Sequence, residues 1–201
     1  GSSRLDLKPL DMQWLDSPHT AIFLDQAVEL LAAEFGNSPL FVIEDPISCR
    51  LFPFWLEALE RFDCVARPML VTCNPVELSR ILHSELGLTE AHGQIMWLRH
   101  MLDAEIGTRG VERFLTSIDL LTEHWDIVAQ DAQQKFNISW PRPIANIEFD
   151  VKPLIERAKM SQAARADRSL KSPLVAEWVR ESYEIFDRWA RDGESPSDYP
   201  A

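Results

Sequence analysis

The sequence predicts an α/β fold with three layers, in which helices flank a short and mostly parallel sheet. Two apolar runs, residues 40–43 and 69–72, contain β-branched side chains and are typical of strands buried on both faces of a parallel sheet. The segment between them, residues 50–62, has helical apolar periodicity, with Pro53 in its first turn. Strand, helix and strand in this order predict a βαβ unit, whose crossover makes the strands parallel.

The chain before this unit predicts an extended lead-in over residues 1–16 and then a helix. Ser17 suits the N-cap position, Pro18 suits the first helical turn, and Gly36 is typical of a helix end. After the second strand, Asn74 and Glu77 have the spacing of a capping box. The further elements expected up to residue 143 are helices over residues 75–86, 89–106 and 119–136 and a third, short strand over residues 112–116.

The part of the chain from residue 144 to residue 191 is predicted to be a helical extension of the α/β domain at residues 1–143. Residues 144–151 predict irregular or short extended structure, a weakly periodic helix follows over residues 154–169, and a strongly amphipathic helix over residues 174–190. The apolar stripe of the last helix must cover the domain's own sheet or another chain, and in the second case it predicts an oligomer interface. The stripe includes Trp178, Phe186 and Trp189. Residues 192–201 are acidic and rich in Ser and Pro, which predicts a disordered tail.

Composition restricts the class of partner. The formal net charge of −12 makes nucleic-acid binding unfavourable, because that affinity comes largely from Lys and Arg at phosphates. No apolar run approaches the roughly 20 residues that a membrane-spanning helix needs. Three cysteines without CxxC spacing indicate reduced thiols and a cytoplasmic location. His92 and His100 roughly share a helix face, but no third ligand follows at metal spacing, so no metal site is predicted.

The ends of the first two predicted strands carry the candidate site residues, since ligands of open α/β sheets bind beyond the carboxyl ends of the strands. Asp45 could position Mg²⁺ or cap the turn before Pro46. The capping role is favoured because the sequence contains no GxxxxGK[ST] motif. Cys73 could be a thiol activated by the following helix or a structural thiol, and the structural role is favoured.

Two strings of sequence resemble bacterial PAPS-dependent sulfotransferase-like proteins. In those proteins, a strand ending in a Lys-Asp-Pro-Arg-like turn precedes Cys-Arg-Leu-Leu-Pro-hydrophobic-Trp, and the next strand usually ends in Arg-His-Pro. The corresponding strings here are FVIEDPISCRLFPFWLEAL and MLVTCNPVELSRIL. The matching positions are Asp45, Pro46, Cys49, Arg50, Leu51, Pro53 and Trp55. Later segments, IMWLRHMLDAEIGTRG, ERFLTSIDLLTEHW and FNISWP, follow the same order, so the resemblance covers residues 1–143.

This resemblance implies a P-loop-type parallel sheet and transfer of a sulfuryl group from PAPS to a hydroxyl, commonly on a carbohydrate. It aligns Asp45, Cys73, Asn74, Ser79 and Ile81 with the nucleotide site. In the family, an Arg at the end of the second strand and a Ser on the next helix bind the 3′-phosphate. Cys73 and Ile81 stand at those two positions here. The family's Gly/Ser/Thr-rich phosphosulfate loop has no counterpart in the sequence, and we expect it to belong N-terminal to residue 1.

Two functional hypotheses follow. In the first, the chain is a sulfotransferase-like domain with a degenerate or incomplete PAPS site, which needs no cofactor and serves as a non-catalytic binding or assembly module. In the second, it is a fragment of an active carbohydrate sulfotransferase that uses PAPS. The neutral side chains at Cys73 and Ile81 favour the first. The partner would be another protein or a carbohydrate acceptor.

Overall fold

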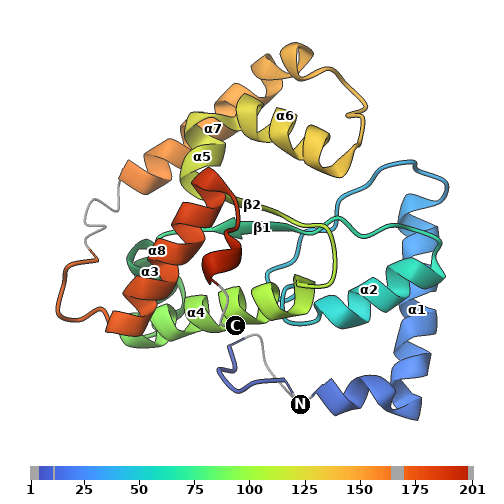
Figure 1. Ribbon diagram of the computed structural model, residues 1–201, viewed down its shortest axis with the longest axis horizontal. Helices are drawn as coiled ribbons and strands as arrows, with labels where there is room; N and C mark the ends of the chain where they lie inside the picture. The colour runs from blue at the N-terminus through green and yellow to red at the C-terminus, as the bar shows by residue number, and fades with distance from the viewer. Residues whose placement is uncertain (1–4, 11, 164–169, 199–201) are drawn as a thin grey trace. The chain divides into compact units, whose positions relative to one another are not determined.

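The computed structural model describes residues 5–10, 12–163 and 170–198 of the chain (Figure 1). Among these residues it has eight α-helices, three short 3₁₀ helices and two β-strands, which form a parallel sheet. The fold is therefore α/β, as predicted. The chain divides into two compact units, and each is described by itself. Unit 1 comprises Gly1–Pro68 and His100–Glu112, and unit 2 comprises Met69–Arg99 and Arg113–Ala201. The predicted domain boundaries at residues 143 and 191 remain predictions.

Unit 1 is built around two helices, α1 (Pro18–Phe35) and α2 (Phe52–Arg61), with a 3₁₀ helix, η1 (Met12–Asp16), ahead of α1. Both α-helices match their predicted positions, because local signals define their ends. Pro18 opens α1 and Gly36, at φ 53°, closes it. The buried core between the helices consists of Leu24, Ala27, Leu31 and Ala58.

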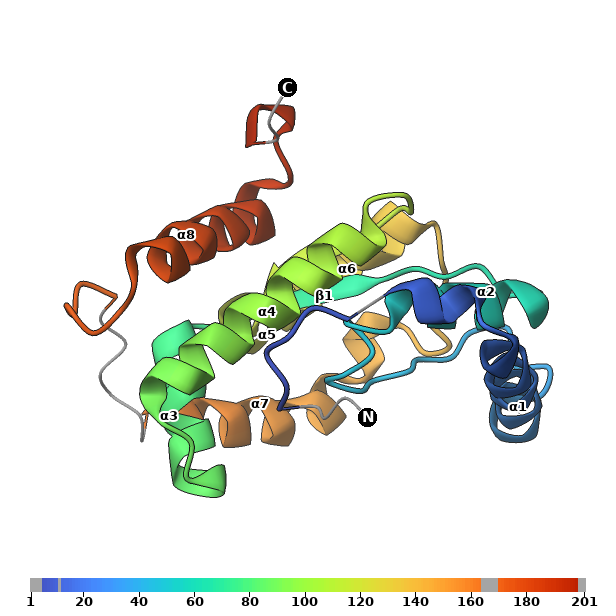
Figure 2. The same ribbon diagram turned by 90° about the horizontal axis from the view of Figure 1, so that it is seen from below.

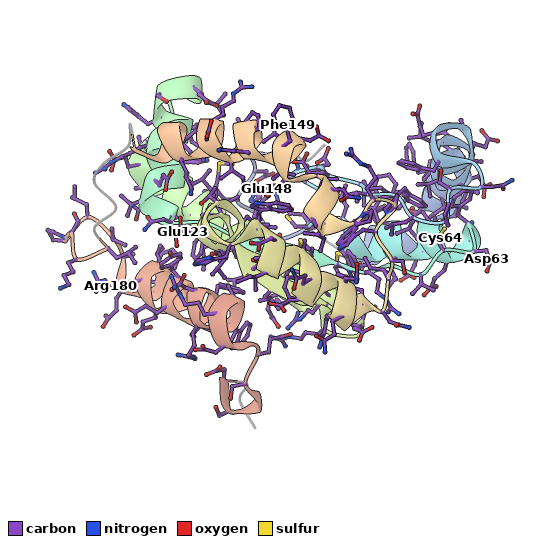
Figure 3. The ribbon with its side chains drawn as sticks, turned by 90° about the horizontal axis from the view of Figure 1, so that it is seen from above. Asp63, Cys64, Glu123, Glu148, Phe149 and Arg180 are labelled. Atoms are coloured by element: carbon purple, nitrogen blue, oxygen red, sulfur yellow. The ribbon has the colours of Figure 1, made fainter. Side chains whose placement is uncertain are left out.

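The end of α2 uses a left-handed residue that is not glycine. Asp63 has φ 59°, and the Cys64 amide donates a hydrogen bond to the Leu59 carbonyl at 2.8 Å. This bond is the 6→1 contact of a Schellman motif, in which Asp replaces the usual Gly. Both residues lie directly after α2, as Figure 3 shows.

The predicted strand at residues 40–43 is wrong, because residues 41–45 have no regular secondary structure. Val42 is 73 % exposed, whereas Phe41 and Ile43 pack against the core of α1 and α2. The ring of Phe41 stacks on Phe35 with centroids 4.1 Å apart. The apolar side chains in this run are thus covered by helices and not by a strand ladder. The predicted βαβ unit beginning at Leu40 is therefore also wrong.

The sheet lies in unit 2 and consists of β1 (Met69–Thr72) and β2 (Phe114–Ser117). The strands are parallel, with Met69 opposite Phe114 and Thr72 opposite Ser117. β2 is the strand that was predicted at residues 112–116, displaced by one to two residues. The chain joins the two strands through α3 (Pro75–Leu86) and α4 (Glu90–Thr108), and the crossover connection therefore follows β1.

Helices α3 and α4 approach each other closely within unit 2. A Cβ atom added to Gly93 of α4 would lie 2.7 Å from the Ser79 Cα of α3, a separation that real Cβ atoms essentially never show. The absence of a side chain at Gly93 therefore permits the contact between these helices. The start of α4 lies within one residue of its predicted position, and Thr89 caps it, since the Thr89 hydroxyl accepts a hydrogen bond from the His92 amide at 3.2 Å.

Four helices follow β2: α5 (Ile118–Glu123), α6 (Trp125–Phe136), α7 (Glu148–Ala163) and α8 (Glu177–Asp192). The single helix predicted over residues 119–136 is wrong, because His124, at φ −140° and ψ 42°, separates α5 from α6. Residues 144–151 are also not extended. A 3₁₀ turn at Ile144–Asn146 leads into α7, whose first turn contains the favourable acids Glu148 and Asp150. Residues 164–169 of the predicted helix lie outside the described part.

Helix α8 packs on the sheet of its own unit, with contacts to both β1 and β2 (Figure 1). Its residues Tyr183 and Phe186 meet Trp97 of α4 edge-to-face, at centroid distances of 5.9 and 6.2 Å, and the two helices run side by side in Figure 2. Phe186 and Trp189 are buried, and Trp178 is 48 % exposed. Most of the apolar stripe that was predicted as a possible oligomer interface is therefore buried within unit 2.

The segment after α8 is tied down as far as Asp198, which contradicts the predicted disorder over residues 192–198. Glu194 forms a bidentate ion pair with Arg113. The Asp198 carboxylate accepts hydrogen bonds from Arg188 and from the Trp189 indole, both at 2.6 Å. These contacts lower the pKa of Asp198, with the Arg188 hydrogen bond as the largest cause. Residues 199–201 of the predicted tail lie outside the described part.

Candidate functional site

The five residues predicted at the nucleotide site fall in both units. Cys73, Asn74, Ser79 and Ile81 follow the carboxyl end of β1 in unit 2, whereas Asp45 belongs to unit 1. The four residues of unit 2 lie within nine residues of one strand-to-helix segment, from Cys73 after β1 to Ile81 in α3. They are therefore the group whose geometry tests whether an anion site can form.

Asp45 has the turn-capping role favoured from the sequence. Its Oδ1 accepts a hydrogen bond from the Ile47 amide at 2.6 Å, and the side chain is exposed. The Asp45 carbonyl also accepts from the Ser48 amide at 3.0 Å. These bonds describe an Asx-type turn around Pro46.

Asn74 occupies the N-terminus of α3 with its own side chain. The Asn74 Oδ1 accepts hydrogen bonds from the Val76 amide at 2.9 Å and from the Glu77 amide at 3.3 Å. Unsatisfied amides at a helix N-terminus are the groups that would hold a phosphate or sulfate. Because Asn74 already engages two of them and is buried, this helix end is closed to an anion unless the cap moves.

Ser79 does not present its hydroxyl to a ligand. The residue is 0 % exposed, and its Oγ donates to the Val76 carbonyl at 2.8 Å. Gly93 of α4 lies against its Cα and Cβ. Ser79 is therefore part of the contact between α3 and α4, and a phosphate could reach it only if the two helices separated.

The remaining positions provide little positive charge. Cys73 and Ile81 are both half-buried, and they contribute a thiol and an alkyl group. The basic residue nearest to Cys73 and Ile81 in sequence is Arg80, whose Nε lies 3.8 Å from Glu90 Oε1. A guanidinium that faces a carboxylate is partly neutralised. This segment therefore has neither the fixed cation nor the accessible donors that recognition of a 3′-phosphate requires.

Two buried hydroxyls at the end of the sheet have no hydrogen-bond partner among the described residues: those of Thr72 and Thr116. In the strand register, Thr72 lies opposite Ser117, and Thr116 lies opposite Val71. Side chains alternate between the two faces of a sheet, so the two threonines point to opposite faces. They do not converge on one ligand. Ser117 itself caps α5, since its Oγ accepts from the Leu120 amide at 3.2 Å.

An apolar hollow in unit 1 was not predicted from the sequence. It has a volume of about 340 Å³ and is lined by α1, α2 and η1. We call it the α1 groove, and its main lining residues are Trp14, Phe23, Gln26, Leu30, Phe54 and Trp55. Phe54 and Trp55 pack against the core of α1 and α2, and they also form a wall of this groove. The sequence contained one signal for the groove, the seven-residue spacing of Phe23 and Leu30, which places both side chains on the same side of α1.

The three cysteines all lie in the described part and form no disulfide, as the sequence indicated. Burial, followed by the negative charge of Asp103, raises the pKa of the Cys49 thiol to about 11. A thiol with this pKa stays protonated at neutral pH and is a poor nucleophile.

Within the described residues, no group of three or more His, Cys, Asp or Glu side chains is arranged to hold a metal ion. The helices described here also include none with the length and apolar character needed to cross a membrane.

Comparison of the chain with protein-family models, curated proteins and solved structures gives no match.

Proposed function

We propose that this chain is a sulfotransferase-like module whose PAPS site is degenerate, and that it acts as a non-catalytic binding or assembly element. Such a module would keep the three-layer arrangement of its family without the nucleotide chemistry. The proposal is supported above all by Ser79. It is the hydroxyl nearest to the aligned 3′-phosphate position in sequence, and it is fully buried and bonded to the Val76 carbonyl.

Electrostatics support the same proposal. PAPS carries phosphate and phosphosulfate groups, which proteins hold with charge-assisted hydrogen bonds and helix N-terminal amides. In this chain the aligned positions carry Cys73 and Ile81, and the Asn74 side chain occupies amides of α3. Sulfuryl transfer also needs groups that stabilise the departing negative charge. A chain with a formal net charge of −12 offers no general attraction that would replace them.

The proposal includes a cytoplasmic location, which three cysteines outside disulfides support. It also includes independence from cofactors and a partner that is another protein. The competing hypothesis, a fragment of an active carbohydrate sulfotransferase, requires cations from a segment outside this chain.

Calorimetric titration with PAP, the product nucleotide, at low salt tests the proposal. We expect no saturable heat at micromolar concentrations, while circular dichroism verifies that the protein is folded and an active PAPS-dependent sulfotransferase serves as the positive control. The Cys73→Arg variant should also fail to bind, because one added guanidinium leaves Ser79 buried and Asn74 in place. Micromolar affinity in either protein would overturn the degenerate-site proposal. Titration of a longer product of the same gene would separate degeneration from truncation.

A further inference from the structure

Large apolar side chains of helix α1 are exposed to solvent in and beside the α1 groove. On α1, Phe23 is 57 % exposed and Leu30 is 53 % exposed, and the adjacent Ile22 is 58 % exposed. Phe23 and Leu30 are seven residues apart, so they lie on the same side of the helix about two turns from each other. Contiguous exposed apolar surface of this kind marks an interaction site more often than a scatter of single side chains does.

Aromatic side chains make the opposite wall of the groove firm. The ring of Phe54 lies 5.8 Å from that of Trp14 and 5.6 Å from that of Trp55, measured between centroids. Trp14 is itself held in place, because the Thr20 hydroxyl donates to its carbonyl. The groove is thus largely pre-formed, which lowers the entropy cost of binding. Its main polar lining residue is Gln26.

The elements that form the groove are strongly acidic. Helix α1 contains Asp25, Glu29 and Glu34 but no Lys or Arg. In η1 and α2, the acids are Asp16, Glu57 and Glu60, and Arg61 is the single basic residue. Arg61 is occupied by acids of the same elements, with its guanidinium 2.6 Å from Glu57 and 3.3 Å from Asp25. The apolar α1 groove is therefore flanked by negatively charged side chains.

We propose that the α1 groove binds a basic amphipathic helix of another protein. Grooves of this type accept the apolar face of a helix through anchors at positions i, i+3 or i+4, and i+7. The separation of Phe23 and Leu30 matches such a row, since seven residues of α-helix span about 10 Å. Lys and Arg beside those anchors would meet Asp16, Glu29 and Glu34. The inference rests on the proposed function and deepens it, because it names the binding surface and the class of partner.

Other occupants fit the groove less well. A carbohydrate needs several polar partners as well as an aromatic platform, and Gln26 alone offers few. An anionic membrane surface would be repelled by the acids of α1. A second copy of this chain would need a basic amphipathic helix. The amphipathic α8 is rich in acids and most of its apolar stripe is buried, and α7 carries as many acids as basic residues, three of each.

Fluorescence anisotropy with designed peptides tests the inference on the whole chain. The probe is a labelled 15-residue helical peptide with Leu at positions i, i+3, i+4, i+7 and i+11 and Lys at the flanking positions. The controls are the same peptide with its residues reordered, so that no apolar face forms, and a version with Glu in place of Lys. We expect saturable binding of the first peptide that weakens as salt rises, because exposed charges are screened.

Leu30→Asp and Phe23→Ser should each weaken this binding by about tenfold or more, as expected when an apolar anchor is lost. Both residues are more than half exposed, so the variants should still fold. Val42→Ser is the matched control in unit 1, since Val42 is exposed and does not line the groove. Unchanged binding by both groove variants, or equal binding of the Glu peptide, would overturn the inference.

Two further outcomes would assign the groove to another occupant and also overturn the inference. One is a dimer in sedimentation that Leu30→Asp dissociates. The other is binding to vesicles containing phosphatidylserine that the same variant abolishes. The outcome of the PAP titration is independent of all these results. A chain that binds PAP but also the basic peptide would refute the proposed function and leave the groove assignment standing.

Discussion

Replacing Gly93 with Ala should separate helices α3 and α4 and destabilise unit 2. The new methyl group would lie 2.7 Å from the Ser79 Cα and 2.8 Å from its Cβ. Favourable contacts between carbon atoms lie at about 3.5–4.0 Å, so the overlap approaches 1 Å. The Cα belongs to the helix backbone and cannot rotate away, and one helix must therefore shift as a whole.

The magnitude follows from two opposing effects. Overpacking of a well-packed contact typically costs about 1–3 kcal/mol. Replacement of Gly by Ala within a helix stabilises the folded state by at most about 1 kcal/mol, because Ala has the higher helix propensity. We therefore expect the free energy of unfolding to fall by about 1–2 kcal/mol. In a chain of this length, that loss corresponds to roughly 2–8 °C in the melting temperature.

Urea unfolding followed by circular dichroism and by tryptophan fluorescence measures this loss. Trp97, which is buried on α4, reports on unit 2. Gly107→Ala is the matched control on the same helix, since its Cβ would meet Phe52 Cβ at an ordinary 3.5 Å, and we expect it to be neutral or slightly stabilising. If Gly93→Ala were as stable as the parent chain with an unchanged spectrum, the close contact at Ser79 would be refuted, and with it the argument that Ser79 is unavailable to a nucleotide.

Two more predictions concern Arg50 and Cys49 in unit 1. The Arg50 side chain is buried, lies 2.9 Å from Asp103, and donates to the carbonyls of Asp6 and Lys8 at 2.7 and 2.5 Å. Arg50→Met should cost about 3–5 kcal/mol in urea unfolding, because it breaks an ion pair whose guanidinium is buried and removes both hydrogen bonds to the carbonyls of residues 6 and 8. It should also make the chain around Leu7 more sensitive to thermolysin, which cleaves before Leu. Equal thermolysin sensitivity would contradict this bridging role. For Cys49, the pKa of about 11 in the folded chain lies above the ordinary value of 9.0. Its stabilising contribution is therefore complete below pH 9 and is lost as the pH rises through about 11. Iodoacetamide at pH 8 should modify Cys49 much more slowly in the native chain than in urea, as read by peptide mass spectrometry, and similar rates would exclude the raised pKa.

Elements with local end signals could be predicted from the sequence. Pro18 and Gly36 mark α1, and Asn74 marks the start of α3, because capping depends on residues close in sequence. The strand predicted at residues 40–43 was wrong because an apolar run can be buried either within a sheet or against neighbouring helices. In the structure, Phe41 and Ile43 of this run pack against α1 and α2. No local pattern distinguishes these two outcomes.

The candidate site was predictable only in part. The neutral side chains of Cys73 and Ile81 are visible in the sequence, and so is the cap at Asn74. The burial of Ser79 is not, since it depends on Gly93 in a different helix. The α1 groove was missed for a related reason. Helical periodicity places Phe54 on the core side of α2, but it does not show that the core leaves part of the ring uncovered.

The parallel pairing of β1 and β2 has a consequence for how unit 2 folds. Met69 pairs with Phe114, about 45 residues further along the chain, so closing this loop costs entropy before any ladder bond forms. Helices α3 and α4, in contrast, consist of local contacts that can form early. We therefore expect the two helices to dock first and to carry the strands together afterwards. In that order of events, the close contact of α3 and α4 that Gly93 permits affects the rate at which the sheet forms as well as the stability of unit 2.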